Sequence, residues 1–225
     1  MNRPRERASM RDEEYQLLDE IVRSEKPHDT LEIGMAHGGS TVVICRALHR
    51  LGRGRHVAID PFQTSDEWWR GTGLARVAAN GLDAHLELIE EFDHLALPRL
   101  LHDGRRFDLI LVDGWHSFDH TMLDFFYADL LLRIGGVVMF HDTCLPSVHR
   151  VCRFIETHKP YDPIGPPPIA FAPWPTVRAW RRMMRLATAR PTTADIRLRR
   201  TRWFTLAAYR KRADRLVPDL FHADF

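Results

Sequence analysis

The sequence lacks several features that would place it in a special class of protein. Its three cysteines, Cys45, Cys144 and Cys152, show no C-x-x-C spacing, which indicates free thiols in a reducing compartment and no disulfide framework. No apolar run is long enough to span a membrane, and the charged N-terminus lacks the apolar segment of a secretory signal. We therefore expect a cytoplasmic globular protein with one main domain in its 225 residues.

Charge is nearly balanced over the whole chain but is unevenly distributed. The net charge is +2, whereas the chain from Thr176 onward has 13 Arg or Lys against 4 Asp. That part therefore carries +9 and the remainder −7. A basic C-terminal part can contact nucleic acid, anionic lipid or an acidic substrate, and an arginine-rich face exposed to water explains the same composition.

Apolar periodicity predicts an α/β fold. Apolar runs of strand length alternate with stretches of helical periodicity, which is typical of βαβ units and a parallel sheet. The predicted strands are 30–34, 55–60, 85–91, 107–114 and 135–142, and the predicted helices are 11–25, 40–51, 95–101, 121–132 and 146–158. Ser40 stands where it would cap the second helix.

Composition divides the chain into three predicted parts. Residues 1–28 form an N-terminal helical arm, residues 29–159 the α/β core, and residues 160–225 a Pro-rich stretch followed by the basic part. In the last part we expect a helix over 176–189 and a strand-like pair within 196–211. This part would complete the sheet with antiparallel strands or form a lid. Trp174 and Trp203 are expected to be packing residues.

Polar residues follow all five predicted strands. The strands lead into "EIGMAHGGST", "AIDPF", "IEEFD", "VDGWH" and "FHDT". In an open parallel sheet, ligands bind outside the carboxyl ends of the strands. A single aspartate after a strand is usually a turn former or a helix cap, but five polar ends at one edge predict a binding site.

The first strand leads into a turn that contains glycines. Gly34, Gly38 and Gly39 would let the backbone approach a ligand, and the following helix would offer free N–H groups to an anion. The G-x-x-x-G-G spacing fits neither the nicotinamide fingerprint nor a phosphate-binding loop. Asp60, at the end of the second strand, is placed to accept hydrogen bonds from ribose hydroxyls. These features predict a cofactor that contains a nucleoside but is not a dinucleotide.

Four segments together resemble the class I S-adenosylmethionine-dependent methyltransferases: "LEIGMAHGGST", "AIDPF", "DLILVDGWHSFDH" and "LLLRIGGVVMFHDT". More narrowly, they are similar to a branch with a D-G-x-H motif that includes metal-assisted O-methyltransferases of sugars and natural products. The resemblance spans about Thr30 to Phe154. It implies a Rossmann-like, doubly wound, mostly parallel seven-stranded sheet with helices on both faces. It also implies S-adenosylmethionine as cofactor and a small-molecule hydroxyl as acceptor.

The resemblance implies which residues hold the cofactor. The turn after the first strand would hold the methionine part, Asp60 the ribose, and residues after the third strand would lie near the adenine. The resulting set of cofactor-binding residues is Glu32, Gly34, His37, Gly38, Gly39, Ser40, Thr41, Asp60, Phe62, Glu91, Phe92 and Asp113.

The resemblance also implies the catalytic residues and a metal site. His116 matches a general base, and Asp113 and Asp142 match ligands of a divalent cation, Mg²⁺ or Mn²⁺. A histidine titrates near neutral pH and can take the hydroxyl proton, while a cation would make that proton more acidic. The metal-assisted relatives place two acids together after the fifth strand, whereas this chain has His141–Asp142.

This departure leaves two mechanisms open. Mg²⁺ prefers oxygen ligands, so an imidazole from His141 would favour a softer ion such as Mn²⁺, Fe²⁺ or Zn²⁺. Adjacent residues of a strand point to opposite faces, which would keep His141 away from an ion held by Asp142. Without a metal, His116 or His141 would act as the base alone.

Four further residues lie near these motifs. His120, one helical turn after His116, would face the same site or the solvent. Asp119 would help to start that helix. Trp68 and Trp69 would cover the site or pack against the body.

Three functions remain open from the sequence. O-methylation of a small molecule is favoured by the His116 motif. An RNA methyltransferase would use the basic C-terminal region, but no recognisable RNA-binding module accompanies the core. A non-catalytic scaffold is opposed by the intact cofactor motifs. We also expect a homo-oligomer, with the N-terminal helix and the Pro-rich arm as interface elements.

Overall fold

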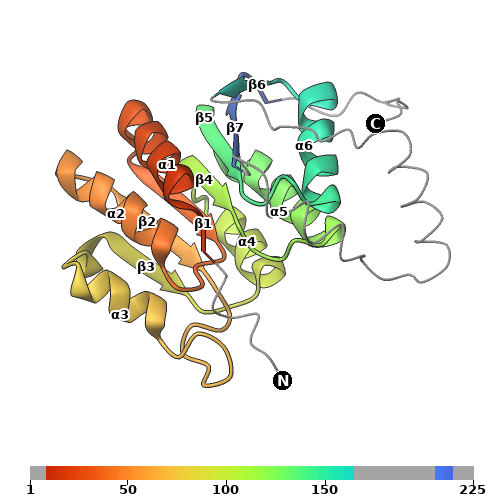
Figure 1. The fold of residues 1–225 in the computed structure, drawn as a ribbon. Coiled ribbons are helices and arrows are strands. Elements are labelled where there is room, and N and C mark those ends of the chain that lie inside the picture. The colour runs from red at the N-terminus through yellow and green to blue at the C-terminus, as the bar shows by residue number, and fades with distance from the viewer. Residues whose placement is uncertain (1–8, 165–205, 215–225) are drawn as a thin grey trace.

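The fold is a single seven-stranded sheet between two layers of helices (Figure 1). The computed structural model describes residues 9–164 and 206–214. The strands are β1 (Asp29–Ile33), β2 (Arg55–Ile59), β3 (Leu86–Ile89), β4 (Phe107–Val112), β5 (Leu132–Phe140), β6 (Tyr161–Ile164) and β7 (Ala207–Lys211). The helices are α1 (Asp12–Glu25), α2 (Gly39–Leu51), α3 (Thr72–Ala79), the 3₁₀ helix η2 (Asp83–His85), α4 (Asp93–His102), α5 (Phe118–Leu131) and α6 (Pro146–His158).

The sheet has the strand order β3-β2-β1-β4-β5-β7-β6. The first five strands are parallel, whereas β7 pairs antiparallel with both β5 and β6. This confirms the predicted doubly wound, mostly parallel, Rossmann-like sheet. No helix in the described part of the chain is long and apolar enough to cross a membrane.

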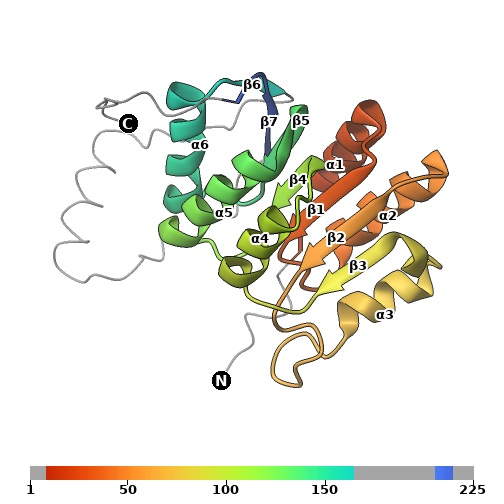
Figure 2. The same ribbon diagram turned by 180° about the vertical axis from the view of Figure 1, so that it is seen from behind.

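Alternating side chains of the strands build a core on each face of the sheet. Leu31 and Ile33 of β1 pack in the cluster that includes residues of α4, α5 and α6 (Figure 2). Leu109 and Leu111 of β4 pack in the cluster on the opposite face, with residues of α1 and α2. Because each buried strand is covered on both faces, its sequence is a continuous apolar run.

The five predicted strands and five predicted helices all exist, with ends displaced by up to three residues. Three elements were missed: α3, the short 3₁₀ helix η2 and β6. The prediction that Ser40 caps α2 is wrong: the cap position is Gly38, which has a left-handed backbone, and no side chain caps the helix. The helix predicted over 176–189, the start of the strand-like pair, Trp174 and Trp203 lie outside the described residues.

The strand order reverses at β1, which lies between β2 and β4. The loops that follow β1 and β4 come close together at this point. Gly34 has φ +92°, and a Cβ atom there would lie 2.3 Å from the carbonyl oxygen of Asp113. Only glycine fits both the left-handed backbone and this separation. The reversal is therefore the place where the fold presents loops to a ligand.

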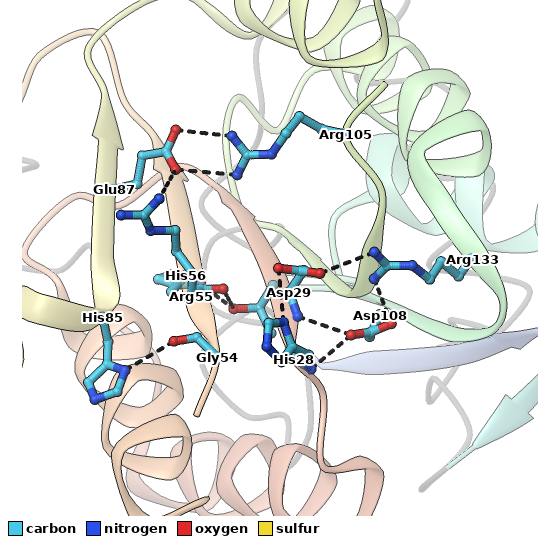
Figure 3. Close-up of polar contacts among 11 residues, drawn as sticks. His28, Asp29, Gly54, Arg55, His56, His85, Glu87, Arg105, Asp108 and Arg133 are labelled. Atoms are coloured by element: carbon cyan, nitrogen blue, oxygen red, sulfur yellow. Dashed lines mark hydrogen bonds and ion pairs between the residues drawn. The ribbon is translucent and has the colours of Figure 1, made fainter. Parts of the chain in front are cut away.

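The amino ends of the strands carry a network of paired charges, shown in Figure 3. Asp108 of β4 accepts hydrogen bonds from the backbone N–H groups of His28 (2.8 Å) and Asp29 (3.0 Å). Arg133 donates to the carboxylates of Asp108 (2.8 Å) and Asp29 (3.1 Å). Burial opposes ionisation of Asp108, but these N–H groups and Arg133 lower its pKa below the usual range.

A second part of the same network lies beside β2 and β3 (Figure 3). Glu87 accepts two hydrogen bonds from Arg105, at 3.2 and 3.3 Å, and lies 3.7 Å from Arg55. His85 contacts the carbonyl oxygen of Gly54 through its Nδ1 atom at 3.1 Å. In both parts of this network, every carboxylate lies against arginine or a backbone N–H group.

Candidate functional site

A cavity of about 320 Å³ opens at the carboxyl ends of the central strands. It is lined by Ser9, Ile33, Gly34, Ala36, Ile59, Asp60, Pro61, Phe62, Trp68, Trp69, Asp93, Asp113, Gly114, Trp115, His116, His141 and Asp142. These residues include four aspartates and two histidines but no lysine or arginine. The cavity is therefore a region of negative potential with apolar walls, and it favours neutral or positively charged ligands.

Asp60 organises the loop after β1. Its Oδ2 atom accepts hydrogen bonds from the backbone N–H groups of Met35 (3.1 Å) and Ala36 (2.8 Å) and from the Gln63 amide (3.1 Å). Its Oδ1 atom accepts one from the backbone N–H of Phe62 (2.9 Å). A carboxylate oxygen can accept two hydrogen bonds, so Oδ1 can still accept one from a ligand.

Glu32 lies beneath the glycine loop and not in the cavity. Its fully buried carboxylate accepts hydrogen bonds from the hydroxyls of Ser40 and Thr41 at the start of α2. His56, also fully buried, contacts it through Nε2 at 3.1 Å. This buried cluster holds the N-terminus of α2 against β1 and β2, so Glu32 positions the loop from below.

The D-G-x-H motif after β4 meets the end of β5. His116 Nε2 lies 3.2 Å from Asp142 Oδ2. Asp142 follows the end of β5 and has a left-handed backbone with φ +55°. The hydroxyl of Ser147, in the first turn of α6, donates to the carbonyl oxygen of His116. A histidine held by a carboxylate on one ring nitrogen can take a proton on the other.

His141 forms the second acid–histidine contact of the site. Its Nδ1 atom lies 2.8 Å from Asp113 Oδ1, and its Nε2 atom lies 3.4 Å from Glu14 Oε2 of α1. Burial opposes its charged form, but the charge and hydrogen bond of Asp113, followed by Glu14, raise its pKa well above the usual range. His141 and Asp142 both line the cavity, because strand alternation ends at Phe140.

Sequence analysis missed a third acid–histidine contact, at the start of α4. Asp93 lies 3.0 Å from His120 Nδ1 and also accepts from the backbone N–H of His94. Burial, followed by the charge of Asp93, raises the pKa of Asp124 to about 9. Burial works against ionisation of Asp93 too, but the contacts with His120 and with the backbone N–H of His94 lower its pKa. Asp93 is thus the ionised member of a carboxyl pair at the cavity wall.

Aromatic side chains form one wall of the cavity. Phe62 stacks on Trp68 with ring centroids 4.7 Å apart, and Trp115 lies edge-on to both rings at 6.4 and 6.3 Å. Phe92 contacts Phe62 at 5.6 Å. Trp68 and Trp69 both line the cavity, so covering the site is the interpretation that the structure supports. Such a wall can stack on a planar ring.

The structure brings part of the predicted set together. Seven predicted residues line the cavity: Gly34, Asp60, Phe62, Asp113, His116, His141 and Asp142. The other predicted residues lie around or beneath it: Glu32, His37, Gly38, Gly39, Ser40, Thr41, Glu91 and Phe92. Glu91 instead pairs with Arg99 at 2.7 Å. Sequence analysis missed Ser9, Asp93 and Trp115 in the lining, and Glu14 behind it.

The side chains predicted to hold a divalent cation do not fit that role as they are arranged. Asp113 and Glu14 occupy the two ring nitrogens of His141, and a metal ligand needs a free nitrogen lone pair. Asp142 is paired with His116. Within residues 9–164 and 206–214, no group of three or more His, Cys, Asp or Glu side chains could hold a metal ion.

Comparison with known proteins places this site in a recognised family. The family model described as a methyltransferase domain matches residues 31–143, half of the chain. Catechol O-methyltransferase B of Danio rerio is 28% identical over 156 residues. That match covers 67% of this chain and 55% of the relative, so the chain spans about half the length of that relative.

Solved structures share the fold at lower sequence identity. The O-methyltransferase TomG of Streptomyces achromogenes, involved in tomaymycin synthesis and solved with S-adenosylmethionine, is 23% identical with a TM-score of 0.60. The match covers 70% of this chain and 74% of TomG. An O-methyltransferase of Bacillus cereus, solved with S-adenosylhomocysteine, is 17% identical with a TM-score of 0.60 and coverages of 70% and 75%.

Proposed function

The chain belongs to the methyltransferase-domain family, and on this premise we propose that it transfers the methyl group of S-adenosylmethionine to a hydroxyl of a small molecule. One observation carries the proposal: the glycine loop after β1 and the His116–Asp142 pair line the same cavity. A cofactor held by the loop would therefore present its methyl group to an acceptor beside a base.

The cofactor would follow the carboxyl edge of the sheet. The methionine part would lie against Gly34 and Ala36, the residues of the loop between β1 and α2 that line the cavity. Asp60 Oδ1 would accept a ribose hydroxyl, and the aromatic wall of Phe62 and Trp68 would stack on a planar ring. The acidic lining favours the positively charged sulfonium of the cofactor.

The chemical step is an in-line displacement. The acceptor oxygen attacks the methyl carbon, the carbon–sulfur bond breaks, and S-adenosylhomocysteine leaves with the bonding pair on sulfur. His116 takes the hydroxyl proton. Asp142 Oδ2, which lies 3.2 Å from Nε2, would stabilise the imidazolium that forms. No residue in this step needs a bound metal.

The acceptor is a neutral or positively charged hydroxyl compound. Among the described residues that line the cavity there is no lysine or arginine to bind a carboxylate or phosphate of the acceptor. The aromatic wall suits a planar acceptor such as a phenol, and the catechol O-methyltransferase relative adds support for that class. The sugar acceptor suggested by the sequence resemblance has no specific contact in its favour.

The proposal is tested by binding first and turnover second. We expect S-adenosylhomocysteine to bind in a calorimetric titration with a micromolar Kd, and tritium from [methyl-³H]S-adenosylmethionine to appear in a phenolic acceptor. Matched panels of catechols, sugars and a short RNA separate the acceptor classes. The absence of any binding of S-adenosylhomocysteine would refute the proposed function and favour a scaffold role. Methylation of RNA alone would refute the small-molecule acceptor.

Two expectations from the sequence stay predictions: the homo-oligomer and the cytoplasmic location. Light scattering coupled to gel filtration would measure the oligomeric state. A monomer at micromolar concentration would contradict it. The predicted division into residues 1–28, 29–159 and 160–225 also stays a prediction, although β6 and β7 join the sheet of the core.

A further inference from the structure

The environment of His141 points to a specific role for a residue outside the family match. His141 is 8% exposed at the end of β5, and Glu14 is 2% exposed on α1. Glu14 occupies the third position of that helix, where it also accepts a hydrogen bond from the backbone N–H of Arg11 (2.8 Å). One buried carboxylate therefore caps the start of the helix and contacts the site at the same time.

The ring of His141 joins two carboxylates. Nδ1 faces Asp113 Oδ1 at 2.8 Å, and Nε2 faces Glu14 Oε2 at 3.4 Å. Each ring nitrogen therefore faces one carboxylate oxygen. The contact with Glu14 is the longer of the two and orients the ring. The contact with Asp113 has the length of a charge-assisted hydrogen bond.

We infer that His141, clamped between Asp113 and Glu14, does not ligate a divalent cation, so that this chain transfers methyl groups without a metal and Glu14 acts as a positioning residue. This inference rests on the proposed function. His141 stands where the metal-assisted relatives place the first of two acids, and both of its ring nitrogens face carboxylates. Asp142 is then available to hold His116, the proposed base.

The competing interpretation is that Glu14 only anchors α1 on the sheet. In that case its loss would change the free energy of unfolding and leave both metal binding and turnover per folded molecule unaltered. A substitution that keeps the helix start but removes the charge separates the two. Glu14→Gln does this, because glutamine at the third position can still accept the Arg11 N–H bond.

The first experiment measures metal binding directly. Mn²⁺ is titrated into the full chain with S-adenosylhomocysteine present, and free Mn²⁺ is followed by electron paramagnetic resonance. We expect no site tighter than 1 mM in the wild type. In His141→Asp, which puts two carboxylates side by side next to Asp113, we expect one Mn²⁺ to bind at least 10-fold more tightly. A wild-type site of micromolar affinity that Asp142→Ala removes would overturn the inference.

Turnover provides the second readout. With a methyl acceptor found as above, we expect the wild-type kcat to stay within twofold in EDTA. Glu14→Gln should lower kcat about 10-fold with an unchanged KM for S-adenosylmethionine, whereas Glu13→Gln, on the exposed neighbour, should change neither. Loss of activity in EDTA that Mn²⁺ restores, or equal kcat for the two variants, would contradict the inference. Failure to bind S-adenosylhomocysteine would refute the proposed function alone, because the Mn²⁺ titration can also be run without it.

Discussion

The two ends of the sheet use the same residue types in different ways. At the amino ends, Asp108 and Glu87 lie against arginines or backbone N–H groups, and a Cβ atom added at Gly135 would meet no neighbour within 4 Å. At the carboxyl ends, the cavity holds four aspartates without any lysine or arginine among its described lining, and Gly34 is tightly packed. Opposite charges balance at the amino ends of the strands, whereas negative charge is in excess at the carboxyl ends.

This difference separates stability from function in one fold. A surface network of paired charges contributes modestly to stability and does not depend on a bound ligand. A cavity lined by acids and held together by histidines has a cost in stability, and a cationic ligand removes part of that cost. The comparison therefore predicts that matched substitutions at the two ends will have opposite signatures.

The largest difference is expected between Gly34 and Gly135, two of the glycines that have positive φ. Gly34→Ala would place Cβ 2.3 Å from the Asp113 carbonyl oxygen and should abolish binding of S-adenosylhomocysteine and lower the free energy of unfolding by about 3 kcal/mol. Gly135 has φ +85°, but a Cβ atom there would meet no neighbour within 4 Å. Gly135→Ala should therefore lower the free energy of unfolding by only about 1 kcal/mol, from backbone strain, and leave binding intact. Calorimetry and urea unfolding measure both. Equal binding by the two variants would show that the β1–β4 contact is not part of the cofactor site.

Two carboxylates provide the next test. Asp142→Asn removes the charged partner of His116, so kcat should fall about 10- to 100-fold while the affinity for S-adenosylhomocysteine stays within threefold. Asp108→Asn, at the amino end, should leave kcat unchanged and lower the midpoint of thermal unfolding. Steady-state kinetics and thermal melts on the same preparations separate the two. A normal kcat in Asp142→Asn would remove His116 from the role of base.

The buried carboxyl pair should make stability depend on pH. The pKa of Asp124 is raised to about 9 in the folded chain, above its ordinary value near 4. The unfolded chain therefore releases this proton first, and the group costs stability progressively as pH rises from about 4 toward 9. Asp124→Asn should remove that cost and gain about 1 kcal/mol or more at pH 8 relative to pH 5. Urea unfolding of the wild type and the variant at the two pH values tests this. An equal loss of unfolding free energy in Asp124→Asn at pH 5 and pH 8 would contradict it.

The smallest effect is expected at Arg133. Arg133→Met removes its contacts with Asp108 and Asp29, which are partly exposed, so the cost should be about 1 kcal/mol. Because the folded pKa of Asp108 is lowered, its contribution is present above pH 4 and lost as pH falls through the folded pKa. The variant should thus differ least from the wild type in acid and in high salt. Chemical unfolding at three pH values is sufficient to check it.

Much of the sheet and part of the site could be predicted from the sequence. Gly34, Asp60 and Asp113 follow buried strands directly, and parallel strands bring their carboxyl ends to one edge. His116 comes three residues after Asp113 in the same loop. β6 was missed because Pro163 argues against a strand. The structure accommodates it because β6 lies at the edge of the described sheet, where it pairs with β7.

The missed site residues depend on contacts between distant segments. Glu14 lies 127 residues from His141 in the sequence, and no local pattern joins them. One signal was present: Glu14 precedes Leu18 by four residues and so lies on the apolar face of its helix, where a charge needs a partner. Asp93 and Trp115 gave no such signal, because a polar helix start and a loop aromatic are common in any α/β fold.

The position of β7 has a consequence for how the chain folds. β7 lies between β5 and β6, yet it is the last described strand in the sequence. Until it is synthesised and inserted, β6 has no partner among the described strands, and Val137–Phe140 of β5 lack the β7 partner on their apolar edge. Such edges template intermolecular pairing. The nascent chain is therefore exposed to aggregation before β7 leaves the ribosome, and a chaperone that shields the β5 edge would raise its yield.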